Sequence, residues 1–160
     1  MISTLIRAIT YATLFIGFFL IAVPAQLLSA SGVTRPALES PVQLAGASLV
    51  VFGAIVTIAC VVTFLVFGRG TPAPFDPPRR LVARGPYRFV RNPMSLGATM
   101  AIGGAALVYG SWGLGSYAAI FFAFMHAFVI AYEEPTLRET FGTPYDDYCG
   151  SVRRWWPALR

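Results

Sequence analysis

Residues 92–132 read NPMSLGATMAIGGAALVYGSWGLGSYAAIFFAFMHAFVIAY, and none of them is Asp, Glu, Lys or Arg. A membrane span needs about 20 mostly apolar residues, so this stretch is too long for one transmembrane helix. Its centre, SWGLGS at residues 111–116, is rich in turn-forming residues and predicts a tight connection. We therefore expect a helical hairpin with arms at residues 94–110 and 116–133. Each arm would be about 26 Å long, which is just enough to cross a membrane.

Two further stretches without these charged residues lie upstream, at residues 8–34 and 40–68. They predict helices at about residues 4–24, ending near Pro24, and at residues 43–67. A cleaved signal peptide is the alternative for the first stretch, because a basic residue precedes it and small residues follow it. The apolar run is long for such a peptide, so we favour a transmembrane helix.

The composition agrees with a membrane protein. Hydrophobic residues make up 56% of the chain and charged residues 12%, and all 12 basic residues are arginine. These values exclude an ordinary soluble domain, a disordered chain and a disulfide-stapled module, and they argue against a nucleic-acid partner. The predicted fold is all-α: a polytopic membrane bundle of four transmembrane helices with short amphipathic cytoplasmic helices. Residues 1–67 would hold the first two spans. Residues 68–160 would hold a cytoplasmic loop, the hairpin and the C-terminal tail.

The arginines predict the orientation. Residues 68–93 hold six arginines and one acidic residue, and four more arginines follow Glu133. The connections expected on the opposite side carry only Arg35 and Glu39. Because positive loops stay inside, both termini and residues 68–93 are expected in the cytoplasm. We expect an integral protein of a bacterial or archaeal plasma membrane.

The second half of this loop reads RGPYRFVRNPM, residues 84–94. Pro93 is expected in the first turn of the third span, and a helical turn would align Arg88 with Arg91. Two interpretations stay open: an anchor for lipid phosphates, or an anion clamp near a helix N-terminus for carboxylate or phosphate. The proline-rich residues 71–78 before it are expected to form an extended, stiff strap.

Two adjacent carboxylates, Glu133 and Glu134, stand at the expected end of the fourth span. Burying either is costly unless it is paired, and acids are unfavourable at a helix C-terminus. A partner is therefore expected, either an arginine or a ligand, and a solvated helix end with salt bridges is the alternative. Pro135 is expected to start a short helix that Gly142 stops, and Thr143 to cap another.

The only histidine, His126, lies seven residues before Glu133, two turns away on the same helix face. An ionisable group within a span is expected to face the bundle interior. Two roles stay open for it, a hydrogen-bonded packing role and a catalytic or substrate-contacting role. We expect no metal site, because no cluster of metal ligands occurs in the sequence.

These motifs occur in an order that is characteristic. GPYRFVRNPM at residues 85–94 is followed by EEPTL at 133–137, and then by Phe141-Gly142, Tyr145, Tyr148, Val152 and Pro157. Over residues 80–157 the chain resembles the integral-membrane methyltransferases of the isoprenylcysteine carboxyl methyltransferase and phospholipid N-methyltransferase superfamily. The resemblance implies S-adenosylmethionine as cofactor and S-adenosylhomocysteine as product, bound at the cytoplasmic ends of the last two spans. It implies that the cofactor is bound by Tyr87, Arg88, Arg91, Asn92, Pro93, Glu133 and Glu134.

The resemblance also implies methyl transfer to a lipid-like, isoprenoid or other amphipathic acceptor, with membrane lipids as partners. Glu133 and His126 are the candidate catalytic residues, and His126 is the obvious base for an amine or thiol acceptor. The isoprenylcysteine enzymes usually have histidine where Asn92 stands and arginine where Val129 stands. The alternatives are isoprenylcysteine carboxyl O-methylation proper, an NADPH-dependent membrane reductase and a non-enzymatic scaffold. The oligomeric state is not predicted.

Overall fold

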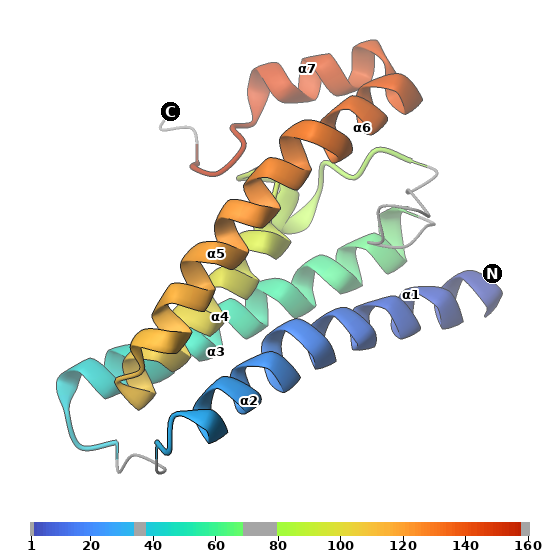
Figure 1. Ribbon diagram of the computed structural model, residues 1–160. Coiled ribbons are helices and arrows are strands. Elements are labelled where there is room, and N and C mark those ends of the chain that lie inside the picture. Colours follow the sequence, from blue (N-terminus) through green and yellow to red (C-terminus); the bar gives the residue numbers. More distant parts are fainter. Residues whose placement is uncertain (1, 34–37, 69–79, 158–160) are drawn as a thin grey trace.

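The computed structural model describes residues 2–33, 38–68 and 80–157. Within these ranges the chain forms helices and turns, without a strand. The loop before α4 (Pro93–Tyr109) lies near α6 (Glu134–Phe141) and α7 (Thr143–Ser151) at one end of the molecule (Figure 1). The all-α fold predicted from the sequence is thus confirmed, whereas the strap expected at residues 71–78 lies outside the described residues.

The first helical run is longer than the sequence predicts. It comprises α1 (Ile2–Phe15), the π-helical turn η1 (Ile16–Ala22) and α2 (Val23–Ala30). The predicted end near Pro24 is wrong, because this proline lies in the first turn of α2, directly after the π-helical turn. Proline is tolerated in a first turn, where the N–H that it lacks is not needed for an α-helical hydrogen bond.

The second run is α3 (Pro41–Thr63), continued by the π-helical turn η2 (Phe64–Gly68), and it agrees with the predicted helix at 43–67. Its start is a capping box. The Ser40 hydroxyl accepts the Gln43 backbone N–H at 3.2 Å, and the Gln43 side chain accepts the Ser40 backbone N–H at 3.1 Å. Both bonds satisfy donors that a helix start otherwise leaves free.

α3 packs closely against α4 (Pro93–Tyr109), whose bounds match the prediction. A Cβ atom at Gly97 would lie 2.9 Å from the Gly53 carbonyl oxygen, and one at Gly46 would lie 2.7 Å from that of Gly104. Side chains larger than hydrogen would therefore push the two backbones apart. Such contacts between small residues are a usual way for helices to associate in a membrane.

The connection between α4 and α5 (Trp112–Phe128) is shorter than expected. Gly110 adopts a left-handed conformation with φ 59°, and the Ser111 hydroxyl then caps α5 by accepting the Leu114 backbone N–H at 3.3 Å. These two residues suffice to reverse the chain, so the turn predicted at residues 111–116 is wrong.

α5 also does not end where the sequence predicts. It continues through the π-helical turn η4 (Val129–Glu133) into α6 (Glu134–Phe141), so the two glutamates lie inside one helical run. After Gly142, with φ 58°, the chain forms α7 (Thr143–Ser151). The predicted cap at Thr143 is wrong, because Gly142 occupies the N-cap position and no side chain caps α7.

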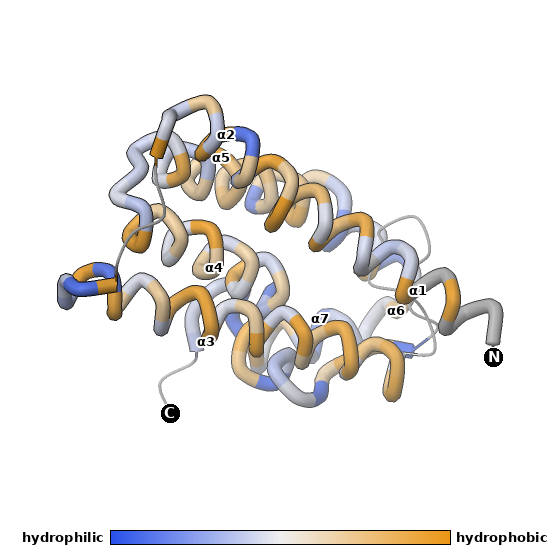
Figure 2. Tube along the Cα trace, turned by 90° about the horizontal axis from the view of Figure 1, so that it is seen from below, coloured by the Kyte–Doolittle hydropathy of each residue, from blue (hydrophilic) through white to orange (hydrophobic). Residues whose placement is uncertain are grey.

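Among the described residues, three helical runs are long and apolar enough to cross a membrane: Ile9–Ala30, Pro41–Gly68 and Trp112–Phe141. The fourth predicted span, Pro93–Tyr109, is apolar but has only 17 residues. Hydrophobic residues run along these helices, and hydrophilic residues gather mainly at their ends and around α7 (Figure 2).

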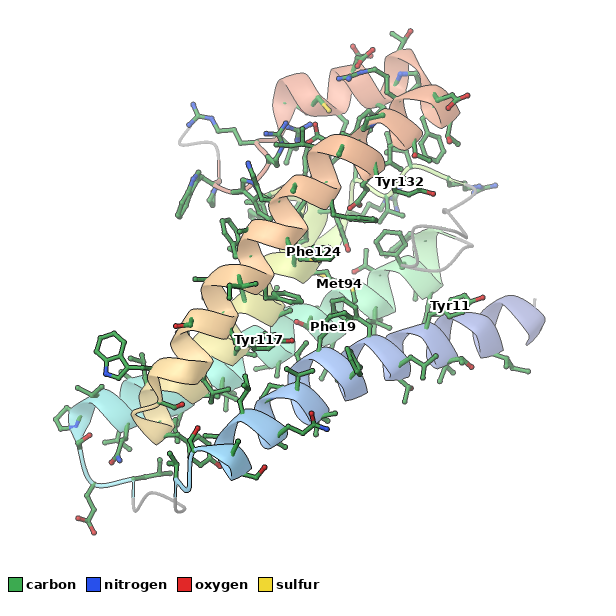
Figure 3. All side chains as sticks on the ribbon, in the orientation of Figure 1. Tyr11, Phe19, Met94, Tyr117, Phe124 and Tyr132 are labelled. Carbon is green, nitrogen blue, oxygen red and sulfur yellow. The ribbon has the colours of Figure 1, made fainter. Side chains whose placement is uncertain are left out.

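One buried cluster joins the hairpin to the N-terminal run. Ile102 of α4 and Phe121 of α5 belong to it, and Phe15 and Phe19 pack against it. The Tyr117 hydroxyl donates a 3.0 Å hydrogen bond to the Phe19 carbonyl oxygen (Figure 3). In the π-helical pattern the Phe19 carbonyl would accept the N–H of residue 24, which is a proline without an N–H, so a side chain of α5 can bind this carbonyl instead.

Candidate functional site

The loop before α4 is held by a buried tyrosine. Its 3₁₀ turn η3 (Gly85–Arg88) places Tyr87 against Cys60 and Val82, with its ring edge-on to Phe64 at a centroid distance of 5.2 Å. Burial raises the pKa of Tyr87 well above its usual value, so the hydroxyl is neutral at physiological pH. This contact fixes the loop to the end of α3.

The C-terminal segment (residues 143–157) pairs with the same loop. The backbone N–H of Arg91 donates to the Arg153 carbonyl at 2.9 Å. Both the backbone N–H and the side-chain amide of Asn92 donate to the Arg154 carbonyl, at 3.3 and 3.4 Å. The buried Asn92 thus fastens the C-terminal segment to the start of α4, and its side chain does not cap that helix.

A second tie links α7 to the loop. The Tyr148 hydroxyl donates a 2.6 Å hydrogen bond to the Tyr87 carbonyl oxygen. Burial raises the pKa of Tyr148, so this hydroxyl keeps the proton that the bond requires. Three segments far apart in sequence therefore meet at one end of the bundle: the loop, the α5–α6 run and the C-terminal segment (Figure 1).

Glu134 is the centre of an ion-pair cluster at this meeting point. Arg154 donates to both of its carboxylate oxygens, from Nε to Oε1 at 2.7 Å and from Nη2 to Oε2 at 2.9 Å. Nη1 of Arg91 lies 3.2 Å from Oε1 of the same carboxylate. The bond to Glu134 raises the pKa of Arg154. The partner predicted for the acid pair is therefore arginine in the case of Glu134.

Glu133 differs from its neighbour. In the part of the chain that the structure describes, its carboxylate has no hydrogen bond or ion pair, although the residue is partly buried. Nε of Arg91 is likewise buried without a partner there. Glu133 directly precedes Glu134, the carboxylate that Arg91 contacts. One acceptor group and one donor group thus remain unused beside the cluster.

Arg88 lies outside this arrangement. Its guanidinium is exposed and stands over the Phe89 ring, 4.9 Å from the centroid. The turn η3 ends at Arg88, so the predicted alignment with Arg91 does not form. Among the other residues expected around the cofactor, Arg91 contacts Glu134, and Asn92 bonds to the Arg154 carbonyl of the same cluster. That these residues bind a cofactor stays a prediction.

His126 does not face the bundle interior, which corrects the prediction. It lines a shallow, mostly apolar groove of about 350 Å³ with Phe122, Ala123, Trp155 and Trp156. Its Nδ1 atom accepts a 2.9 Å hydrogen bond from Nε1–H of Trp155. The described contacts therefore correspond to the packing role that the sequence left open.

Sequence analysis missed two residues of the site. Arg154 and Trp155 belong to the run RRWWP, residues 153–157. Trp155 is 8% exposed and bonded to His126, whereas Trp156 is 71% exposed. No spacing rule links these residues to Glu134, because a loop and a helix separate them. Among the described residues no group of side chains could hold a metal ion.

A family model described as phospholipid methyltransferase matches residues 42–144. This range contains α3, the loop, α4, α5 and both glutamates, and it stops before Arg154. No curated protein and no solved structure gives a significant match.

Proposed function

Because the chain belongs to the phospholipid methyltransferase family, we propose that it is an S-adenosylmethionine-dependent methyltransferase that acts on a lipid-like or isoprenoid amphipathic acceptor. The chain is an integral membrane protein, and the part that the structure describes holds three helical runs of spanning length. One observation carries the proposal. Among the described residues, Nε of Arg91 has no partner, and Glu133, the carboxylate next to the one that Arg91 contacts, has no ion pair.

The unused groups fit the chemistry of this cofactor. S-Adenosylmethionine carries a carboxylate, an amino group, ribose hydroxyls and a positively charged sulfur, and it supplies an activated methyl group. Arg91 would hold the carboxylate through its free Nε, and Glu133 would face the amino group, a hydroxyl or the positive sulfur. Tyr87, Asn92 and Pro93 would form the frame that keeps the two groups in place.

Two residues that the resemblance assigns to the cofactor need different roles. Glu134 is already bound by two arginines, so we propose that it stabilises the arginine cluster and does not itself contact the cofactor. Arg88 is exposed, and the interpretation as an anchor for lipid phosphates suits it better than a place in the clamp.

Methyl transfer requires alignment of the reactants and exclusion of water more than a covalent nucleophile. The C-terminal segment would serve both needs, because its bonds to the loop and to α6 close one side of the cluster. A role for His126 as a base stays a prediction. It requires Trp155 to release Nδ1, since that bond occupies the lone pair that a base needs.

For the methyl acceptor we propose a class of molecule, an amphipathic lipid. The family and the apolar groove beside His126 support a molecule with a hydrocarbon part. Val129 is fully buried and apolar where the isoprenylcysteine enzymes usually have an arginine, so a prenylcysteine carboxylate would lack that partner. We therefore place a lipid acceptor before a prenylated protein.

The location is also proposed in finer detail. The arginines in residues 68–93 and after Glu133 support a cytoplasmic active site and cytoplasmic termini in a bacterial or archaeal plasma membrane. Activity of a reporter fused at the C-terminus tests this orientation in a bacterial host. A fluorescent protein should fold and fluoresce there, and secreted alkaline phosphatase should stay inactive.

The decisive experiment incubates the purified protein with methyl-labelled S-adenosylmethionine and fractionated lipids, and then identifies the labelled product. We expect label in a lipid, and none with the Glu133→Gln variant. Label confined to protein C-termini would show isoprenylcysteine methylation instead. Binding of NADPH without binding of S-adenosylhomocysteine would support the reductase, and binding of neither ligand would support the scaffold.

A further inference from the structure

We infer that Arg154 is a positioning residue, which keeps Arg91 available for a carboxylate ligand by binding Glu134 in its place. The inference rests on the proposed function, because it takes the ligand to be the carboxylate of S-adenosylmethionine. It assigns a role to a residue outside the range that the family model matches.

The first support is the unequal division of Glu134 between two arginines. Arg154 binds both carboxylate oxygens in a fork, with distances of 2.7 and 2.9 Å. Arg91 has a single longer contact, 3.2 Å from Nη1 to Oε1, and that Nη1 also donates to the Cys149 sulfur. The bidentate pair is the stronger arrangement, so Arg154 holds most of the carboxylate's bonding capacity.

The second support is the donor that this division leaves over. The Arg91 side chain is only 13% exposed, and its Nε is buried and has no partner among the described residues. A buried donor without a partner is costly and is retained only where something repays the cost.

The third support is the rigid placement of Arg154. Its own carbonyl oxygen accepts two hydrogen bonds from Asn92, the residue next to Arg91. The backbone of Arg154 is therefore fixed beside the residue whose side chain it would keep free. Without the Arg154 guanidinium, Glu134 would have Arg91 as its remaining partner, and the strongest pair available would use Nε of Arg91.

The test compares S-adenosylhomocysteine with its decarboxylated analogue, which differs in lacking the carboxylate. Dissociation constants are measured for the unmodified full-length protein and for Arg154→Ala. We expect Arg154→Ala to bind S-adenosylhomocysteine about tenfold or more weakly, the scale of one lost charged hydrogen bond, and the analogue almost unchanged. The matched control is Arg153→Ala, which removes an exposed neighbouring arginine side chain and should change neither constant.

The double variant Arg154→Ala/Glu134→Gln separates positioning from general damage. Without the Glu134 charge nothing competes for Arg91, so the double variant should regain much of the affinity for S-adenosylhomocysteine. Arg154→Lys keeps the charge but cannot form the fork, so its affinity for S-adenosylhomocysteine should lie between those of the unmodified protein and Arg154→Ala. It replaces Arg154→Ala in the comparison if that variant does not fold.

The outcomes are distinct. Equal weakening of both ligands in Arg154→Ala, or no recovery in the double variant, would show that Arg154 merely holds the fold, and would overturn the inference. Equal affinity of the unmodified protein for the two ligands would overturn it as well, while leaving the methyltransferase proposal intact. Binding of neither ligand by the unmodified protein would contradict the proposed function itself, and the inference with it.

Discussion

The indole N–H of Trp155 donates a 2.9 Å hydrogen bond to Nδ1 of His126, and this bond determines what the histidine can do. A neutral imidazole that accepts at Nδ1 carries its proton on Nε2, so neither nitrogen has a free lone pair. His126 then presents a hydrogen-bond donor toward the groove. The bond also holds the C-terminal segment against α5.

We therefore expect His126→Asn to keep turnover, because an asparagine side-chain oxygen can accept the Trp155 N–H in place of Nδ1. His126→Leu should instead lower the free energy of unfolding by about 1–3 kcal/mol, since it leaves that N–H without a partner. Labelled-methyl turnover and thermal unfolding in detergent measure the two effects. A His126→Asn protein that binds S-adenosylhomocysteine normally but has lost turnover would establish His126 as a base.

The two adjacent glutamates should respond differently to the same change. Glu133→Gln removes a carboxylate that has no ion pair among the described residues, so it should reduce affinity for S-adenosylhomocysteine with little change in stability. Glu134→Gln should retain binding but lower the free energy of unfolding by about 2 kcal/mol, because Arg154 loses its charged partner. Calorimetric titration and thermal unfolding measure this difference, and identical behaviour of the two variants would contradict it.

Much of the fold was predictable from the distribution of charges. Long stretches without charged residues predict helices of spanning length, and the structure places helices over all four predicted ranges. The helix ends were harder to predict, because Pro24 and Pro135 both look like terminators. Each lies in the first turn of a helix that follows a π-helical turn, where the N–H that proline lacks is not needed, so the helical run continues.

The candidate site was predictable only in part. The sequence predicts an arginine or a ligand as the partner of the acid pair, because a costly acid needs one, and in the structure Arg91 contacts Glu134. They do not identify Arg154 as the stronger partner, because its position depends on how the C-terminal segment folds back onto Asn92. That fold depends on long-range backbone bonds, and local spacing carries no information about them.

The contact between α3 and α4 allows a matched pair of glycine substitutions on one helix. Gly97→Ala would place a Cβ atom 2.9 Å from the Gly53 carbonyl oxygen, so it should separate the helices and lower both stability and the yield of folded protein. Gly103→Ala meets no atom within 4 Å and should be neutral or stabilising by up to about 1 kcal/mol, since alanine favours helix. Thermal unfolding of both variants in the same detergent tests the contact, and equal tolerance of both substitutions would refute it.

Alkaline pH should weaken the docking of the C-terminal segment. Burial raises the pKa of Tyr87, Tyr145 and Tyr148 above the value of about 10 that tyrosine has in an unfolded chain. The folded protein therefore holds these protons more tightly, so its stability should be constant up to about pH 10 and fall at higher pH.

Tyr148→Phe removes one of the three groups and should make the fall in stability shallower. The variant costs about 1 kcal/mol at neutral pH through the lost bond to the Tyr87 carbonyl. Thermal unfolding between pH 8 and about 11 measures the slope. An equally steep fall in the Tyr148→Phe variant would show that this hydroxyl does not contribute to the alkaline loss.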